Sequence, residues 1–252
     1  MINVEMFAAS HTGLVRERNE DSLACQQYQH ADVSICVVAD GVGGHPGGDI
    51  ASRLAVDCVM EFIEESVQQA CNGNGFSENW LKQTAYSAIN YANNAIREMQ
   101  KQQSQLSSMA TTLVLLLRHG ENLVVAHVGD SRCYCWHNNH LQQITEDHTV
   151  AQQMLNNGTL SYEAFLRSGY HHVLNNGLGL YDEVEISLEY HQCHNKLFML
   201  CSDGLTDCVP DADIKNSLIE NTELDNCTNH LIQQALDSGG IDNISIAMCR
   251  CS

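Results

Sequence analysis

The order of strand-like and helix-like segments is the feature that most limits the fold of this 252-residue chain. Segments with strand patterning come in consecutive runs, and segments with helical patterning come in pairs. Because a parallel sheet needs a crossover helix between successive strands, this order argues against βαβ units. It predicts an α+β fold of antiparallel sheets covered by helices. Two prolines, no long charged block and no internal repeat favour one domain over residues 1–252.

The bounds of the elements follow from apolar periodicity and from turn residues. Strands are expected at residues 4–9, 22–28, 33–39, 111–117, 122–128, 132–136, 184–190, 196–200 and 243–249. Helices are expected at residues 48–71 and 78–102, with a turn at 72–75 between them, and two more between 211 and 237. Hairpin turns are expected at 119–120 and 137–139, and short helices with loop at 147–177.

The composition excludes several classes of partner and location. A net charge of -19 and a pI near 4.8 repel nucleic acid and anionic membranes, so we expect neither as a partner. No apolar run approaches the roughly 20 residues that span a bilayer. The N-terminal MINVEMFAASHTG lacks the basic and apolar regions of a signal peptide. We therefore expect a cytoplasmic protein, and a monomer.

The 12 cysteines are scattered through apolar segments of a chain too large to need disulfides, so we expect reduced thiols in the core. Cys133 with Cys135, and Cys249 with Cys251, have the spacing that places each pair on one face of a strand. The cluster at residues 191–194, with two histidines and a cysteine, could bind zinc, but it lacks further spaced ligands.

The stretch VVADGVGGHPGGDIAS, residues 37–52, raises the question of what a glycine-rich turn after a strand holds. A dinucleotide fingerprint would need glycine at Pro46, and a phosphate-binding P-loop would need lysine at Asp49, so both readings fail. Asp40 at a strand end, followed by the exposed carbonyl of Gly41, instead suits a hard cation.

Three further aspartates have a similar setting. Asp130 follows LVVAHVG, Asp203 follows the apolar LFML segment, and Asp242 immediately precedes the last expected strand. A single Asp-Gly is usually only a turn. Four aspartates at strand boundaries beside glycine predict instead that the carboxylates converge at one end of the sheets.

Seven separated motifs carry a family resemblance: GLVRERNEDS (Gly13–Ser22), residues 37–52, ATTLVLL (Ala110–Leu116), HVGDSRCY (His127–Tyr134), ITEDHTVAQQML (Ile144–Leu155), LCSDGLTD (Leu200–Asp207) and GGIDNIS (Gly239–Ser245). In this order they resemble the metal-dependent serine/threonine protein phosphatases of type 2C, called PPM, in the compact bacterial form. The resemblance implies a four-layer α-β-β-α sandwich, with two antiparallel sheets flanked by helix pairs and metals in a cleft at one end.

The resemblance also implies roles for single residues. Asp40 would bridge two divalent ions, Gly41 would lend its carbonyl, and Asp203 and Asp242 would complete the pair. Further roles are implied for Asp130 at a possible third ion, for Glu20 and Asp21 as support of the metals, and for Arg16 as the grip on the substrate phosphate. Arg16, Asp40 and Asp203 are the catalytic residues in this interpretation.

The implied activity is hydrolysis of phosphoserine and phosphothreonine in proteins by a water that bridges two metals, without a covalent intermediate. Carboxylate and carbonyl ligands suit Mn²⁺ or Mg²⁺. Two ions about 3.5–4 Å apart lower the pKa of the shared water and offset the acidic surface for an incoming phosphate. Arginine binds two phosphate oxygens in a fork, although a surface ion pair to Glu17 or Glu20 is the alternative for Arg16. The partners would be phosphoproteins, with an opposing Ser/Thr kinase in a signalling pathway.

Some positions depart from the family pattern. Val42 stands where the animal branch has a histidine, so the proton donor would be a metal-bound water or His45. The alternative for His45, which we favour, is a structural role in the glycine turn. His148 is expected to support the loop that follows it. Residues 158–179 correspond to the flap that borders the cleft, and their sequence is less typical of the family than the other motifs.

Other catalytic classes fit less well. No cysteine has arginine at the spacing of a cysteine-based phosphatase, and neither Ser131 nor Ser202 lies in G-x-S-x-G. A non-catalytic binding module of the same family, and the same chemistry on a small phosphate ester, remain the alternatives.

Overall fold

The computed structural model describes residues 2–42, 47–73, 75–77, 79–165, 169–170 and 172–252. These residues form two antiparallel five-stranded sheets. Sheet A has the order β1 (Val4–His11), β10 (Ile244–Cys251), β9 (Lys196–Cys201), β6 (Arg132–His137) and β7 (His140–Gln143). Sheet B has the order β2 (Asp21–Tyr28), β3 (Val33–Asp40), β4 (Leu113–His119), β5 (Asn122–Val128) and β8 (Ser187–Gln192).

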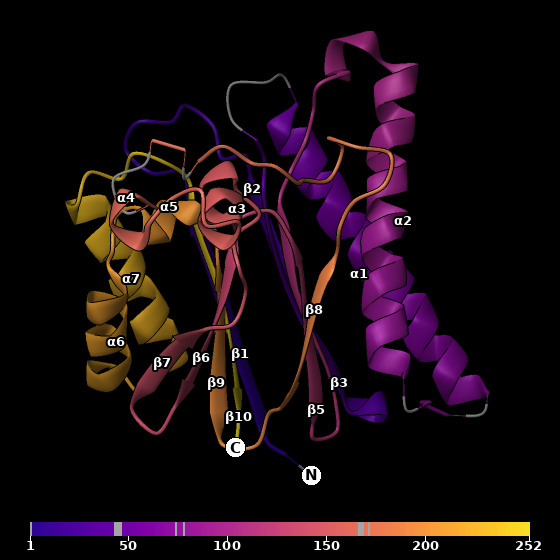
Figure 1. Cartoon of the computed structure of the whole chain (residues 1–252). Coiled ribbons are helices and arrows are strands. Elements are labelled where there is room, and N and C mark those ends of the chain that lie inside the picture. The colour runs from indigo at the N-terminus through magenta and orange to yellow at the C-terminus, as the bar shows by residue number, and fades with distance from the viewer. Residues whose placement is uncertain (1, 43–46, 74, 78, 166–168, 171) are drawn as a thin grey trace.

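Two helix pairs enclose the sheets. The long helices α1 (Gly48–Asn72) and α2 (Trp80–Gln102) lie on the sheet B side, and α6 (Asp211–Glu220) and α7 (Leu224–Asp237) lie on the sheet A side (Figure 1). Short helices complete the chain: η1 (Gln29–Ala31), η2 (Ser104–Leu106), α3 (Val150–Asn156), α4 (Tyr162–Phe165) and α5 (Asp203–Thr206). The predicted four-layer α-β-β-α sandwich is confirmed.

The core has three apolar layers, which explains why the central strands carry apolar residues on both faces. In β4, Leu115 and Leu117 pack against the helices, whereas Val114 and Leu116 pack between the sheets. A strand buried on both faces has no polar face, so its pattern is a continuous apolar run. A third cluster lies between sheet A and the pair α6–α7.

Two sheet edges differ from the prediction. The strand expected at 184–190 begins only at Ser187, because its partner β5 ends at Val128 and the chain turns at Gly129 with φ +102°. The short edge strand β7 was not predicted, since HLQQ has one apolar residue. The expected hairpin turn before it is confirmed, and Asn138 and Asn139 both take left-handed backbone angles there.

The structure also shows the state of the cysteines, of residues 191–194 and of the helices. All 12 cysteines are free thiols, and Cys133, Cys249 and Cys251 are buried in the layer between the sheets. The expectation that the thiols lie in the core is wrong for Cys71, which is exposed at the end of α1. Residues 191–194 form no metal cluster in the part of the chain that the structure describes. Within the same residues, no helix combines the length and the apolar character needed to cross a membrane.

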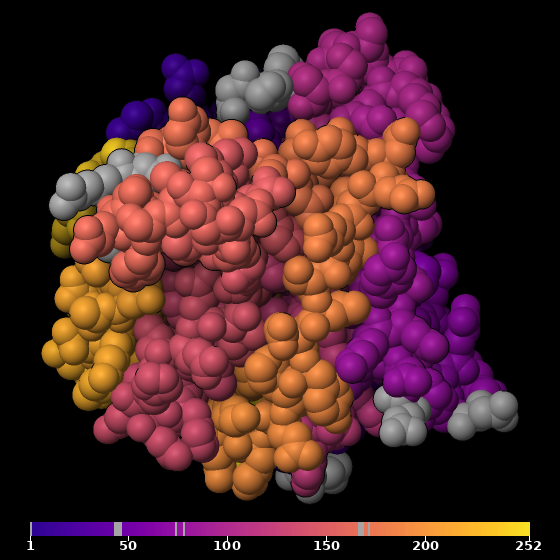
Figure 2. Space-filling view, viewed as in Figure 1, coloured from indigo at the N-terminus to yellow at the C-terminus, as the bar shows by residue number. Residues whose placement is uncertain are grey.

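The long connection between β7 and β8 carries α3 and α4. Figure 2 shows this connection on the outside of the molecule, over the upper part of the face in view. Backbone hydrogen bonds hold its later part in place: Val150 N–H donates to the carbonyl of Val173 (2.8 Å), and Leu178 N–H donates to that of Thr111 (2.9 Å). The connection is therefore anchored beside one end of both sheets.

Candidate active site

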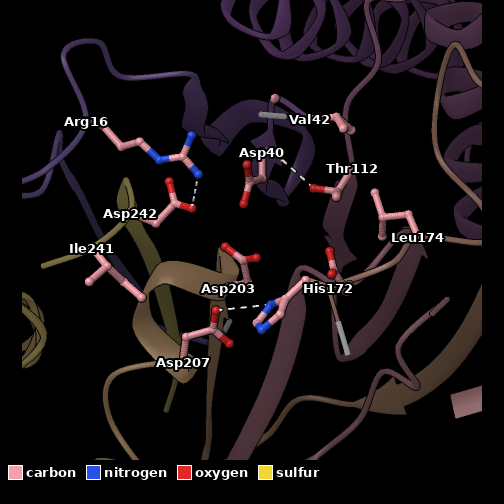
Figure 3. A pocket seen from close by; sticks show the side chains of 12 residues that line it. Arg16, Asp40, Val42, Thr112, His172, Leu174, Asp203, Asp207, Ile241 and Asp242 are labelled. Atoms are coloured by element: carbon pink, nitrogen blue, oxygen red, sulfur yellow. Dashed lines mark hydrogen bonds and ion pairs between the residues drawn. The ribbon is translucent and has the colours of Figure 1, made fainter. Parts of the chain in front are cut away.

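A cavity of about 370 Å³ opens at one end of the sandwich (Figure 3). Strands β3, β5 and β9 end at this edge and β10 begins there, so the residues just outside them meet. The lining residues are Arg16, Asp40, Gly41, Val42, Thr112, Asp130, His172, Leu174, Asp203, Asp207, Ile241 and Asp242. The four aspartates singled out at strand boundaries therefore converge, as their positions predicted.

Backbone contacts fix Asp40 at the end of β3. Its N–H donates to Oγ1 of Thr112 (3.0 Å), and its carbonyl accepts from the N–H of Thr112 (2.8 Å) and from Oγ1 of Thr111 (2.8 Å). Both threonines precede β4, so the expectation that they lie within the strand is wrong. They act as the hydrogen-bonding support of the turn after Asp40.

Gly41 lies where no side chain fits. A Cβ at this position would be 2.4 Å from the backbone of Gly48, at the start of α1. The glycine thus lets the turn after β3 approach the first turn of α1. This close approach positions Asp40 and the carbonyl of Gly41 at the cavity.

The carboxyl groups of the cavity are largely shielded from solvent and lie next to one another. Desolvation raises the pKa of Asp40 well above its ordinary value, and the charges of Asp21 and Asp203 add to this. Asp40 and Asp203 share a hydrogen bond. Desolvation and the charge of Asp203 likewise raise the pKa of Asp130 well above normal. Without a cation, such a group of carboxyls stays together only by holding protons.

Asp21 provides the sharpest test of whether a cation fits. Oδ2 of Asp21 accepts from the Ser202 hydroxyl (2.8 Å). The buried Oδ1 has no hydrogen-bond partner among the described residues, because the hydroxyl of Ser245, which also lies near Asp21, donates to Oγ of Ser10 (2.8 Å). Burial raises the pKa of Asp21 to about 7. A buried carboxylate oxygen without a donor is costly, and carboxylates with a carbonyl are the ligands of Mg²⁺ and Mn²⁺. The residues present therefore fit a divalent cation centre.

Arg16 lies at the mouth of the cavity and forms an ion pair. Its Nη2 is 2.6 Å from Oδ2 of Asp242, and both side chains keep partial exposure, at 39% and 29%. This contact raises the pKa of Arg16. The ion-pair alternatives with Glu17 and Glu20 are wrong, because the partner is Asp242 at the cavity itself.

Asn243 holds the loop that carries Arg16, and the sequence analysis did not single it out. Its Nδ2 donates to the carbonyls of Thr12 (2.7 Å) and Arg18 (2.9 Å), and its Oδ1 accepts from the N–H of Glu20 (2.7 Å). The buried side chain of Asn243, the residue next to Asp242, therefore holds both ends of this loop.

Glu20 and His45 were the remaining predicted residues. The side chain of Glu20 lies beside Gly48 at the start of α1, and Glu20 does not line the cavity. Burial raises the pKa of Glu20. His45 lies outside the described residues.

His172 and Asp207 are cavity residues that the sequence analysis missed as ligands. With Asp203 they form a cluster in which one ligand atom from each residue lies within 4.8 Å of the others. Nδ1 of His172 is 3.4 Å from Oδ2 of Asp207. Asp207 lies in the quoted LCSDGLTD motif, and its position one helical turn after Asp203 is the signal that would have revealed it.

His148 does not line the cavity. Its Nδ1 accepts from the N–H of Gly129 (3.2 Å), its Nε2 contacts Oγ of Ser187 (3.0 Å), and its ring stacks on His127. These contacts hold the turn before Asp130, which was not expected. The expected support of the loop after His148 is seen in a separate contact, in which Nδ2 of Asn176 lies 2.9 Å from Nδ1 of His148.

The chain matches the family model described as "Protein phosphatase 2C" over residues 11–239. It belongs to the protein phosphatase 2C family. It is 33% identical over 239 residues to the serine/threonine phosphatase stp of Listeria innocua, covering 94% of this chain and 91% of the relative. It is 31% identical over 242 residues to the serine/threonine protein phosphatase PstP of Mycobacterium tuberculosis, covering 96% of this chain and 44% of PstP.

Solved structures agree in fold. Serine/threonine phosphatase Stp1 from Staphylococcus aureus superposes with a TM-score of 0.88 at 26% identity, over 99% of this chain and 95% of that chain. The catalytic domain of PstP was solved in complex with two manganese ions, and it superposes with a TM-score of 0.82 at 29% identity, over 100% of this chain and 99% of that chain.

Proposed function

We propose that this chain is a metal-dependent protein phosphatase that hydrolyses phosphoserine and phosphothreonine, and that residues 1–252 act as one catalytic domain with a flap at 158–179. The observation that carries the proposal is the convergence of Asp40, Asp130 and Asp203, whose pKa values are raised by desolvation, on a cavity with an arginine at its mouth. Asp21, which does not line the cavity, adds a buried oxygen without a hydrogen-bond partner. Membership of the family and the names of the relatives support it.

Asp40, the carbonyl of Gly41, Asp203 and Asp242 would hold two divalent ions, with Asp21 in support. When bound, Mn²⁺ or Mg²⁺ supplies Lewis-acid chemistry, which lowers the pKa of water and neutralises phosphate charge. Thr112 and the turn at Gly41 keep Asp40 in place during the reaction. Since water is the nucleophile in this proposal, no covalent phosphoenzyme forms.

Arg16 would bind the phosphate. Its guanidinium has five N–H donors, and the ion pair with Asp242 engages one nitrogen while orienting the group across the mouth of the cavity. Phosphate held there lies within reach of the carboxylates that bind the ions. Arg16 therefore positions substrate and offsets the repulsion expected from the acidic chain.

A third ion is also part of the proposal. Asp130 was expected to help hold it, and the cluster of His172, Asp203 and Asp207 adds an imidazole and one further carboxylate, that of Asp207, beside Asp203. An imidazole ligand favours Mn²⁺ over Mg²⁺, because magnesium prefers oxygen ligands. The cytoplasmic location, the monomeric state and the opposing kinase stay predictions.

The test is turnover of an aryl phosphate and of matched phosphoserine and phosphotyrosine peptides by chelator-treated protein, with Mn²⁺ or Mg²⁺ restored. We expect activity only with metal, unaffected by thiol alkylation, and a preference for phosphoserine. Asp203→Asn is expected to lower kcat by at least ~100-fold and to weaken Mn²⁺ binding in calorimetry. Asp213→Asn, on an exposed position of α6, is the matched control.

Two results would contradict the proposal. Hydrolysis that survives the chelator would remove the metals from the reaction. A folded protein that binds Mn²⁺ without turning over any phosphate ester would favour the binding-module alternative, whereas equal rates on both peptides would reject only the substrate class.

A further inference from the structure

Two cysteines face each other across neighbouring strands of sheet B. In the antiparallel register of β2 and β3, Cys25 is directly opposite Cys36, and their Sγ atoms are 3.1 Å apart. Among the strand registers of the described residues, this is the position at which two cysteines oppose each other. The proposed phosphatase reaction uses neither thiol.

The backbone geometry of this pair suits a disulfide. Directly opposed residues of an antiparallel pair have Cα atoms about 4.5–5.5 Å apart. Disulfides form at Cα separations of about 4.4–6.8 Å, with a sulfur–sulfur bond of about 2.0 Å. The sulfurs must therefore approach by about 1 Å, which side-chain rotation can supply without a shift of the strands.

The two thiols differ in their access to solvent. Cys25 is half-buried at the border of the layer between the sheets, whereas Cys36 is fully buried in it. Cys36 also hydrogen-bonds Cys249, and its Sγ lies 3.6 Å from Sδ of Met6. A dissolved reagent therefore reaches Cys25 before Cys36. The Sγ atom of Cys36 lies behind that of Cys25 and in contact with it.

The hydrogen bonds of Cys36 support this order of events. The contacts with Cys249 and Cys25, together with burial, raise the pKa of Cys36 well above its ordinary value. Because the thiolate is the attacking form, Cys36 is a poor nucleophile for an external reagent, and its attack on Cys25 depends on the contact of the two Sγ atoms at 3.1 Å. Its role is that of a neighbouring thiol that reacts once Cys25 has been modified.

We propose that Cys25 and Cys36 form an oxidation site, at which a low-molecular-weight disulfide converts the pair in the folded protein to a reversible disulfide that links β2 to β3. In the first step the Cys25 thiol attacks the reagent disulfide, forms a mixed disulfide and releases one reagent thiol. In the second step the Cys36 thiol attacks Cys25 Sγ, forms the protein disulfide and releases the second reagent thiol. Each reagent disulfide is thereby reduced to two thiols, and a dithiol reverses the reaction.

The position of the link gives it a structural consequence. The same register pairs Asp21 with Asp40, four positions along both strands, so the link joins the strand that carries Asp40 to the cavity with its neighbour, which carries Asp21. A cross-link without a register shift limits the unfolded chain while leaving the native strands in place. We expect the melting temperature to rise by roughly 5 °C on oxidation.

The experiment treats the folded, full-length protein with oxidised glutathione, alkylates the remaining thiols and digests with chymotrypsin under non-reducing conditions. Chymotrypsin cuts after Tyr28, between the two cysteines, so the disulfide appears as two linked peptides. The wild type should give this linked pair and the higher melting temperature, and dithiothreitol should reverse both. In Cys36→Ser, Cys25 should instead accumulate as a glutathione adduct.

Cys71→Ser is the matched control, because Cys71 is the exposed cysteine at the end of α1 and lacks an opposed thiol. This variant should still form the linked pair. A glutathione adduct that persists on Cys25 in the wild type, a link from Cys36 to Cys249, or a linked pair that forms only after denaturation would each overturn the proposal. The wild-type peptide map decides the matter even where a variant folds poorly.

Discussion

Asp21 is expected to make the metal-free protein less stable as the pH rises. Burial raises the pKa of its carboxyl from 3.8 to about 7. Between these values the native protein holds a proton that the unfolded chain releases. Because the native state binds more protons in this window, the free energy of unfolding falls as the pH increases through it.

The size of this effect follows from the shift. Each unit of pKa difference corresponds to about 1.4 kcal/mol, so ionising Asp21 in the native state costs at most about 4 kcal/mol. From about pH 5 to about pH 8 the loss is about 2.6 kcal/mol. His127 acts in the opposite direction: burial and the charge of His148 lower its pKa to about 4, so it destabilises the native state as the pH falls below its ordinary value of 6.5.

Comparison with Asp21→Asn removes this carboxyl together with its effect on the pKa of Asp40, whereas His127 titrates in both proteins. The assay is urea unfolding of chelator-treated wild type and variant at about pH 5 and about pH 8. We expect the wild type to lose about 2–3 kcal/mol relative to the variant between the two conditions. Saturating Mn²⁺ at the higher pH should remove most of this loss, since a cation then balances the carboxylate.

A single result would refute the reasoning. If the difference between wild type and Asp21→Asn is the same at both pH values, Asp21 is already ionised in the metal-free native protein. Its unpartnered oxygen would then have a donor in solution, and the argument for a cation from this oxygen would fail. Asp213→Asn, with an exposed side chain, should show no pH-dependent difference from wild type.

The remaining predictions concern the turn at the cavity and the loop beside it. Gly41→Ala should lower the free energy of unfolding by at least ~3 kcal/mol and abolish Mn²⁺ binding, because the new Cβ meets the backbone of Gly48 at 2.4 Å. Gly120→Ala, with open space around the new Cβ, should lower it by only about 1 kcal/mol. Equal losses in the two variants would refute the clash. Asn243→Ala loses three hydrogen bonds at a buried position and should lower the free energy of unfolding, measured in urea, by roughly 3 kcal/mol. A change below ~1 kcal/mol would show that other contacts hold the loop that carries Arg16. Arg16→Ala should raise KM for an aryl phosphate roughly 10–100-fold with a smaller change in kcat, and an unchanged KM would assign Arg16 to structure.

Much of the fold was predictable because its signals are local. The apolar runs of the central strands and the helical stripes mark elements that are buried by their own pattern. The two edge strands were less predictable: β8 begins where β5 stops pairing, and β7 exists because β6 offers it a partner. An edge strand is defined by its neighbour, so its own residues carry a weaker signal.

The candidate site divides in the same way. The aspartates at strand boundaries could be recognised from sequence because antiparallel strands bring alternate ends to one edge of a sheet. Asn243 and His172 could not, since their roles depend on contacts with residues far away in the chain. Glu20 illustrates the reverse, because its motif predicted a place near the metals and its side chain lies beside α1.

The sequence by itself determined which groups are available: a sandwich of two sheets, carboxylates at their shared edge, an arginine in the preceding loop and a set of unpaired thiols. Only the tertiary structure decided which of these groups meet. It brings Arg16 into an ion pair with Asp242 and leaves Oδ1 of Asp21 without a hydrogen-bond donor. It also brings the sulfurs of Cys25 and Cys36 into contact. The physical reason is that periodicity fixes the face on which a side chain lies, whereas its partner and its desolvation depend on the packing of segments distant in the chain.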